Sequence, residues 1–155
     1  MKNHSAYIGI GSNVGDPVAN VRRAIDALRE AGVVAVQSSL YRTKPWGKTD
    51  QPEFINAVVR LETALQPRAL LDTLKRLEKQ LGRTEDEHWG PRVIDLDLLT
   101  YDDRTIDEPG LRIPHPELKD RAFVLVPLAE IDSTYAPWRD VLAPDEIAGV
   151  RPIRH

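Results

Sequence analysis

Alternating apolar and polar positions predict four strands in the first hundred residues, and leucines and valines at helical spacing predict two helices between them. The first helix begins at Asp16-Pro17, where an acidic N-cap precedes a proline in the first helical position, and it ends at Gly32. The second helix begins at Gln66-Pro67 and ends at Gly82. The predicted strands cover residues 7–13, 33–43, 54–63 and 93–100.

The order strand, helix, strand, strand, helix, strand is the split βαββαβ arrangement of a ferredoxin-like sandwich. We therefore expect an α+β fold with an antiparallel sheet, both helices on one face, and the other face available to ligands. Residues 104–113 predict a small C-terminal hairpin, because Glu108-Pro109-Gly110-Leu111 suits a type II turn. A short helical segment is expected after Asp120. The tail after residue 131 is expected to be peripheral coil with one short helix near 141–148.

The last predicted strand carries two acidic side chains, Asp95 and Asp97. Because side chains alternate between the faces of a strand, both carboxylates share one face, and the apolar Ile94, Leu96 and Leu98 share the other. Adjacent carboxylates repel and raise each other's pKa, so such a pair commonly persists with a cation between its members. Oxygen-only ligation suits Mg²⁺, which binds few carboxylates and completes its shell with water and substrate phosphates.

The residues before this pair decide between two interpretations of it. An isolated Asp-x-Asp on a strand is more often a solvated face than a metal site. Here it follows a Trp-Gly-Pro-Arg run, which places an aromatic side chain, Trp89, and a guanidinium, Arg92, at the mouth of the strand. This combination favours phosphate chemistry on a nucleotide.

Three further features carry candidate chemistry. Asn56 is an amide at a half-buried strand position, and it can either read the edge of a heterocycle or be a capped residue of an edge strand. His115 lies between two prolines, which restrict the backbone, so it is either a positioned imidazole or a structural or merely exposed histidine. Gly9 and Gly11 are not followed by the Gly-Lys-Ser/Thr of a phosphate loop. Their favoured role is to let the backbone come close to a neighbouring strand or a ligand.

The composition is that of an ordinary globular protein. The 155 residues are 41% hydrophobic and 29% charged, and we expect a single domain over 1–155. The net charge of −3 argues against nucleic-acid binding, which requires a basic surface. The absence of cysteine excludes disulfides, thiolate zinc sites and cysteine nucleophiles. No stretch resembles a signal peptide or a membrane span, so a cytoplasmic location is expected.

Several segments together carry a family resemblance from about residue 6 to residue 131. They are Tyr7-Ile-Gly-Ile-Gly-Ser-Asn13, Ser39-Leu-Tyr-Arg-Thr43, Gln51-Pro-Glu-Phe-Ile-Asn56, Gly82-Arg83, Trp89-Gly-Pro-Arg-Val-Ile-Asp-Leu-Asp97, and Pro114-His-Pro116 through Arg121-Ala-Phe123. This set resembles the 6-hydroxymethyl-7,8-dihydropterin pyrophosphokinases. Enzymes of that family move pyrophosphate from ATP to the hydroxymethyl group of a pterin in folate biosynthesis.

The resemblance implies roles for individual residues. Asp95 and Asp97 would hold two Mg²⁺ ions that bridge the ATP phosphates, and Arg83 and Arg92 would complete the catalytic set by neutralising the transferring group. The residues implied in ATP binding are Lys75, Glu78, Arg83, Trp89, Arg92, Leu98, Arg112, His115 and Arg121. The residues implied in pterin binding are Thr43, Pro45, Trp46, Phe54, Asn56, Trp89, Asp95 and Phe123.

The chain departs from the family at residues 84–88, which are mostly acidic where further basic residues are common. Lys75, Arg112 or Lys119 is a candidate replacement. The resemblance implies ATP and the pterin as partners, without nucleic acid or membrane, and we expect a monomer.

Two other functions remain as alternatives. A Mg²⁺-dependent phosphohydrolase with the same carboxylates would hydrolyse ATP without any pterin. A non-catalytic ferredoxin-like module would bind a nucleotide for regulation, although it would not need a metal pair flanked by two arginines.

Overall fold

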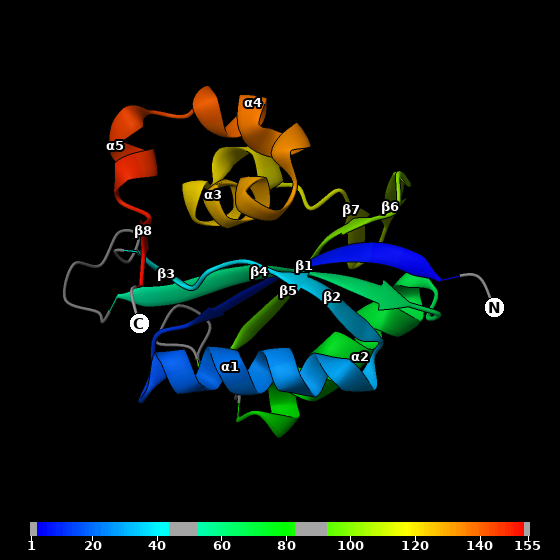
Figure 1. Cartoon of the computed structure of the whole chain (residues 1–155). Coiled ribbons are helices and arrows are strands. Elements are labelled where there is room, and N and C mark those ends of the chain that lie inside the picture. Colours follow the sequence, from blue (N-terminus) through cyan, green and yellow to red (C-terminus); the bar gives the residue numbers. More distant parts are fainter. Residues whose placement is uncertain (1–2, 44–52, 83–92, 154–155) are drawn as a thin grey trace.

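A computed structural model describes residues 3–43, 53–82 and 93–153. In these ranges the main sheet has the strand order β5-β1-β4-β3-β8, and β2 also pairs with β4 (Figure 1). Every pairing in this sheet is antiparallel, as predicted. The strands are β1 (His4–Ser12), β2 (Val33–Gln37), β3 (Tyr41–Thr43), β4 (Phe54–Thr63), β5 (Asp95–Tyr101) and β8 (Arg151–Pro152).

Two helices, α1 (Pro17–Ala27) and α2 (Pro67–Gln80), cover one face of the sheet (Figure 1). Asp16 caps α1, because its carboxylate accepts a hydrogen bond from the backbone N–H of Ala19 at 3.1 Å. The leucines of α2 point into the main core together with apolar residues of β1, β4 and β5. The α+β fold with a βαββαβ core is therefore confirmed.

The second face of the sheet is covered in part, so only the remainder of it is available to ligands. Helix α3 (Ala122–Ile131) packs over its middle, followed by η3 (Ser133–Tyr135), α4 (Ala136–Asp140) and α5 (Pro144–Ala148) (Figure 1). A second core forms there from Val58, Leu99, Leu118, Val124, Leu125 and Leu128. Because α3 is apolar on nearly every side, it can be stable only when it is buried.

Two predictions need correction. The expected long strand over 33–43 divides into β2 and β3 at Ser38, whose backbone N–H donates to Val58 O and whose hydroxyl accepts from Val58 N–H, both at 2.9 Å. The tail after residue 131 contains α4 and β8 in addition to the helix predicted near 141–148, which is α5.

The predicted hairpin is confirmed as β6 (Ile106–Glu108) and β7 (Leu111–Ile113), and Gly110 has the positive φ of 76° that its turn requires.

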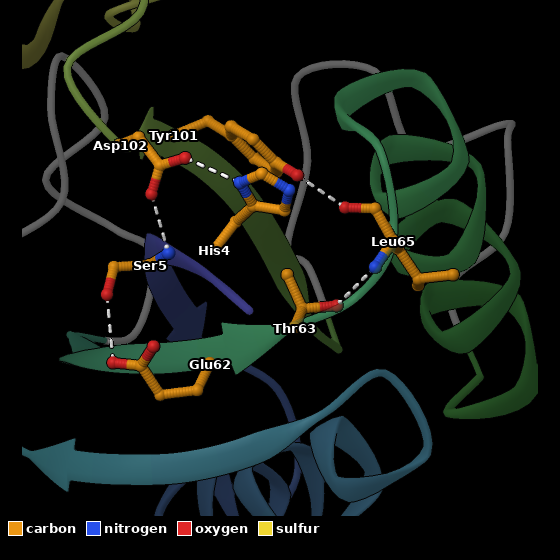
Figure 2. A network of polar contacts seen from close by, with 7 residues as sticks. All are labelled: His4, Ser5, Glu62, Thr63, Leu65, Tyr101 and Asp102. Atoms are coloured by element: carbon orange, nitrogen blue, oxygen red, sulfur yellow. Dashed lines mark hydrogen bonds and ion pairs between the residues drawn. The ribbon is translucent and has the colours of Figure 1, made fainter. Parts of the chain in front are cut away.

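A polar network fastens β1 to its neighbours at the end where the chain begins (Figure 2). Asp102 accepts a hydrogen bond from the backbone N–H of Ser5 at 2.8 Å and lies 2.6 Å from His4 Nδ1. The hydroxyl of Tyr101 donates to the carbonyl of Leu65 at 2.6 Å, which connects β5 to the start of α2.

Within the described ranges, no helix has the length and apolarity needed to cross a bilayer.

Candidate active site

Asp95 and Asp97 share one face of β5, as predicted. Asp97 is in register with Gly9 of β1, and Gly9 is in register with Val58 of β4, a member of the core under α3. Residues directly opposite in an antiparallel pair point to the same side, so both carboxylates lie on the α3 side of the sheet. The alternate residues Ile94, Leu96 and Leu98 belong to the core under α1 and α2.

Two residues implied in ATP binding have their side chains committed elsewhere. Glu78 is buried on α2, and its carboxylate accepts a hydrogen bond from the backbone N–H of Leu96 at 2.8 Å. This hydrogen bond holds β5 at Leu96, the residue between Asp95 and Asp97. Leu98 is 5% exposed in the core on the opposite face, so only its backbone, on the edge strand β5, can meet a nucleotide. We propose no side-chain contact with ATP for either residue.

Gly11 separates the acidic pair from Asn56. It is in register with Asp95 on one side and with Asn56 on the other, so the two polar side chains lie two strand spacings, about 10 Å, apart. A Cβ on Gly11 would lie 2.9 Å from Asn56 Oδ1, whereas one on Gly9 would meet Leu99 at an ordinary 3.5 Å. The predicted close approach is therefore confirmed at Gly11.

Asn56 is not an edge-strand residue, because β4 has partners on both sides. Its Nδ2 donates to Thr43 Oγ1 at 2.6 Å, and both residues are buried. Phe54 is in register with Thr43 and lies two residues before Asn56, so it shares their face. Three residues implied in pterin binding are thus neighbours on the α3 side of the sheet.

The beginning of α3 brings two further predicted residues toward this face. Phe123 is half-buried against the core under α3 described above. It also packs against a smaller cluster formed by Tyr41, Ala122 and Val150. The guanidinium carbon of Arg121 lies 5.3 Å from the centroid of the Phe123 ring. Arg121 also forms an ion pair with Glu117, four residues earlier. The side chains implied in phosphate and pterin binding therefore meet at this point.

His115 is held beside β5 by its backbone, whose N–H donates to Leu99 O at 2.8 Å. Burial lowers the pKa of its imidazole, the negative charge of Asp97 opposes that shift, and the positive charge of Arg121 adds to it. The ring is therefore neutral at pH 7. Because Nδ1 accepts the backbone N–H of Glu117 at 3.2 Å, the ring proton is on Nε2, which can donate to an anion.

Three other basic side chains were candidates for phosphate binding. Lys75 is exposed on α2, and Arg112 is exposed on β7 with Asp107 at 3.4 Å. The ammonium of Lys119 lies 4.6 Å from the ring centroid of Trp138. None of these contacts supports the suggested replacement of the missing basic residues. The predicted residues Arg83, Trp89, Arg92, Pro45 and Trp46, together with the acidic stretch 84–88, lie outside the described residues.

In the described ranges, no group of three or more His, Asp or Glu side chains is arranged to hold a metal ion. Two carboxylates on one face do suit Mg²⁺, which takes its remaining ligands from water and phosphate. A cavity of about 600 Å³ opens on the same sheet face beyond α3, lined by residues such as Tyr7, Arg60 and Asp132. It contains none of the predicted site residues.

Two acidic residues near the site were not predicted. Glu117 pairs with Arg121 across the short 3-10 helix Leu118–Asp120, and Arg121 has extended backbone, so the i, i+4 rule of an α-helix could not have found this contact. Glu130 accepts hydrogen bonds from Tyr41 Oη at 2.6 Å and from the Ser39 hydroxyl at 2.8 Å, which joins α3 to the start of β3. No sequence signal indicates this second contact, because the partners lie about 90 residues apart.

Comparisons with known proteins identify the family to which the sequence belongs. The family model described as 7,8-dihydro-6-hydroxymethylpterin-pyrophosphokinase matches residues 7–133. A Methylorubrum extorquens protein named 2-amino-4-hydroxy-6-hydroxymethyldihydropteridine pyrophosphokinase is 43% identical over 151 residues, which cover 96% of this chain and 89% of that protein. The Bacillus subtilis protein of the same name is 44% identical over 131 residues, covering 83% of this chain and 78% of its own.

The fold is also similar to that of solved structures. The crystal structure of wild-type Plasmodium falciparum HPPK-DHPS with STZ-DHP superposes with a TM-score of 0.66 at 16% identity, over 83% of this chain. This chain spans only 40% of that longer protein. From the sequence matches, the chain belongs to the 7,8-dihydro-6-hydroxymethylpterin-pyrophosphokinase family.

Proposed function

We propose that Asp95 and Asp97 are the residues on which this chain's pyrophosphate transfer depends, and that they act by holding Mg²⁺ with ATP. The family's reaction, transfer of pyrophosphate from ATP to the hydroxymethyl group of 6-hydroxymethyl-7,8-dihydropterin, is the activity of this chain. The observation that supports the proposed site is the shared sheet face of the acidic pair, with the Asn56–Thr43 contact two strands away across Gly11.

The metal proposal follows from the charge of the pair. Two adjacent carboxylates destabilise each other, and a divalent cation removes that repulsion. We propose that Asp95 and Asp97 would hold two Mg²⁺ ions together with ATP, since Mg²⁺ takes few carboxylates and completes its shell with phosphate oxygens and water. When bound, Mg²⁺ would neutralise charge on the phosphates and hold the attacking and leaving oxygens in line.

Basic and neutral donors would hold the triphosphate beside this pair. His115 can donate from Nε2 without adding charge, and Arg121 can form two parallel hydrogen bonds to a phosphate. Arg83 and Arg92, which lie outside the described residues, are proposed from the resemblance to neutralise the transferring group. Catalysis of this kind depends on positioning and charge, with little covalent work by the protein.

The pterin would bind on the Asn56 side. An amide both donates and accepts hydrogen bonds, which matches the mixed edge of a pterin ring. Thr43 orients that amide through the 2.6 Å hydrogen bond. Phe54 or Phe123 would stack on the flat ring, an arrangement that adds about 0.5–1.5 kcal/mol beyond area burial. Pro45, Trp46 and Trp89, outside the described residues, are proposed to line the same pocket.

In the proposed reaction the pterin hydroxyl oxygen attacks the β-phosphorus of ATP. The bond from that phosphorus to the oxygen shared with the α-phosphate breaks, so AMP leaves and the pterin carries the diphosphate. The hydroxyl proton is lost to solvent or to a phosphate oxygen. A phosphohydrolase would instead release ADP or inorganic phosphate from ATP alone, and the Asn56–Thr43 pair would then have no substrate group to read.

Product analysis tests the reaction. Incubation with ATP, Mg²⁺ and the pterin should give AMP and pterin diphosphate in equal amounts by ³¹P NMR, with no turnover when the pterin is left out. Formation of ADP, or consumption of ATP without pterin, would contradict attack at the β-phosphorus.

Substitution of each acid tests the metal assignment. Asp95→Asn and Asp97→Asn should each lower kcat by roughly a hundredfold or more, since each removes a group that stabilises transition-state charge. The melting temperature of each variant without ligands checks that the fold is intact. Asp103→Asn, an exposed acid beyond the end of β5, is the matched control. Near-normal kcat in either variant at saturating Mg²⁺ would reject the assignment.

A further inference from the structure

Residues 134–153 lie beyond the match to the family model, which ends at residue 133. They form α4, α5 and β8, and they run from the surface of α3 back to the edge of the sheet at β3 (Figure 1). We call this stretch the C-terminal brace. Its contacts fall on the elements that carry the proposed pterin residues.

The first contact of the brace is with the strand that contains Thr43. β8 pairs with β3, with Pro152 opposite Tyr41 and Arg151 opposite Arg42. The backbone N–H of Ile153 also donates to the carbonyl of Leu40 at 2.8 Å. β3 has only 3 residues and already pairs with β4 on its inner side, so a second partner on its outer side further restricts the position of Thr43.

The second contact is an apolar cluster between β3 and α3. Val150, only 7% exposed, packs there with Tyr41 and Ala122. Phe123, Val126 and Leu142 are partly buried against the same cluster. The side chain of Val150 therefore lies between the strand that leads to Thr43 and the first turn of α3, which carries Phe123.

A third contact reaches the residue just before β4. The guanidinium of Arg151 lies 3.4 Å from the carboxylate of Glu53, the neighbour of Phe54. Both groups are largely exposed, so this ion pair contributes little energy alone. It does show that the brace spans both strands that hold the proposed pterin residues.

From these contacts we propose that Val150 is a positioning residue for the pterin. It fixes the distance between the Thr43–Asn56 pair on the sheet and the Phe123 ring on α3, so that an aromatic ring fits between them. The proposal rests on the pterin-binding role proposed for these residues. It assigns to the C-terminal brace a part in substrate affinity, although the brace makes no contact with the acidic pair among the contacts described.

The test is steady-state kinetics of Val150→Ala in the full chain, with both substrates varied. Loss of the two methyl groups lets α3 shift relative to β3, and small misplacements of binding groups have large effects on rate. We expect the KM for the pterin to rise roughly threefold to tenfold, with the KM for ATP within about twofold of wild type. If Val150→Ala does not fold, Leu142→Ala perturbs the same cluster and carries the same expectation.

Two matched valine substitutions control for general effects. Val141→Ala lies in the brace but is 83% exposed, and it should change neither KM. Val21→Ala removes the same atoms from a fully buried site in the core under α1, so it should lower stability without raising the KM for the pterin.

An unchanged pterin KM in the folded Val150 variant would overturn the proposal. So would an equal rise in Val21→Ala, because the effect would then be one of stability alone. These results are distinct from failure of the proposed function, in which the wild-type chain would form no AMP from ATP and pterin.

Discussion

At Gly11 the sheet has room for a hydrogen atom but not for a methyl group, because Asn56 Oδ1 lies 2.9 Å from the position of a Cβ. Gly9, two residues earlier on the same face, has only ordinary contacts with Leu99. The two glycines of β1 therefore have different requirements although the sequence presents them alike. Gly11 keeps the Asn56 amide next to the backbone, in the orientation that its hydrogen bond to Thr43 also selects.

Gly11→Ala is expected to raise the KM for the pterin by about tenfold, because the new methyl group displaces the Asn56 amide from a buried hydrogen bond worth roughly 1 kcal/mol or more. The protein should still fold, since the displaced atom is the end of a side chain. Gly9→Ala is the matched control and should keep both KM values within about twofold of wild type. Equal behaviour of the two variants in steady-state kinetics would contradict this account of Gly11.

Residue-scale prediction from sequence worked where local geometry decides. Alternation along a strand placed Asp95 and Asp97 on one face, and the register confirms it. The alternation pattern could not decide whether Asn56 lies on an edge strand, because the answer depends on whether β4 has one neighbouring strand or two. The contact between Glu130 and Tyr41 joins residues 89 positions apart, and that between Thr43 and Asn56 depends on the register of two strands, so neither has a local signal.

At the scale of elements, the βαββαβ order was predictable because each helix has clear ends and each strand a clear pattern. The segment 122–131 was harder, since a helix that is apolar all round shows no 3.6-residue periodicity. This helix is buried over the middle of the second sheet face, which limits the part of that face that a ligand can reach. The proposed site lies on the same face as α3, and the first turn of that helix borders it.

The link between β1 and the end of β5 gives a prediction about pH. Burial alone would raise the pKa of Asp102, but hydrogen bonds from the Ser5 N–H and from His4 outweigh it, so the pKa lies below its usual value. A carboxyl with a lowered pKa in the folded state stabilises the fold above its unfolded pKa of about 3.9 and loses that contribution as the pH falls through the folded value.

Asp102→Asn should therefore lower the free energy of unfolding by roughly 1 kcal/mol at pH 7, a modest figure because the carboxylate is partly exposed to solvent. Urea unfolding at a series of pH values should show the difference from wild type shrinking below about pH 4. Asp103→Asn should have no such effect. A difference that stayed constant down to pH 3 would mean that the charge of Asp102 is not what stabilises this end of the sheet.

For the whole molecule, the edges of the sheet decide whether copies of the chain can join. The β5 edge is partly occupied, because Leu99 O accepts from the His115 N–H and the Leu96 N–H donates to Glu78. On the other side, the pairing of β2 with β4 is irregular between Val34 and Val36. Bulges and covered edges oppose strand addition by a second copy.

Light scattering after size-exclusion chromatography should therefore give a mass near the 17.4 kDa of one chain. A concentration-independent mass of twice that value would contradict the monomer. Charge variants placed on β2 would then locate the interface.

Direct observation of metal and substrates tests the central claim, that Asp95 and Asp97 hold the ions on which pyrophosphate transfer depends. A crystal structure with a non-hydrolysable ATP analogue, the pterin, and Mn²⁺ in place of Mg²⁺ would place the ions by their anomalous scattering. We predict ions coordinated directly by both carboxylates, with the pterin edge hydrogen-bonded to Asn56. Ions bound elsewhere, for example in the cavity beside Tyr7 and Asp132, with no density at the acidic pair, would contradict it.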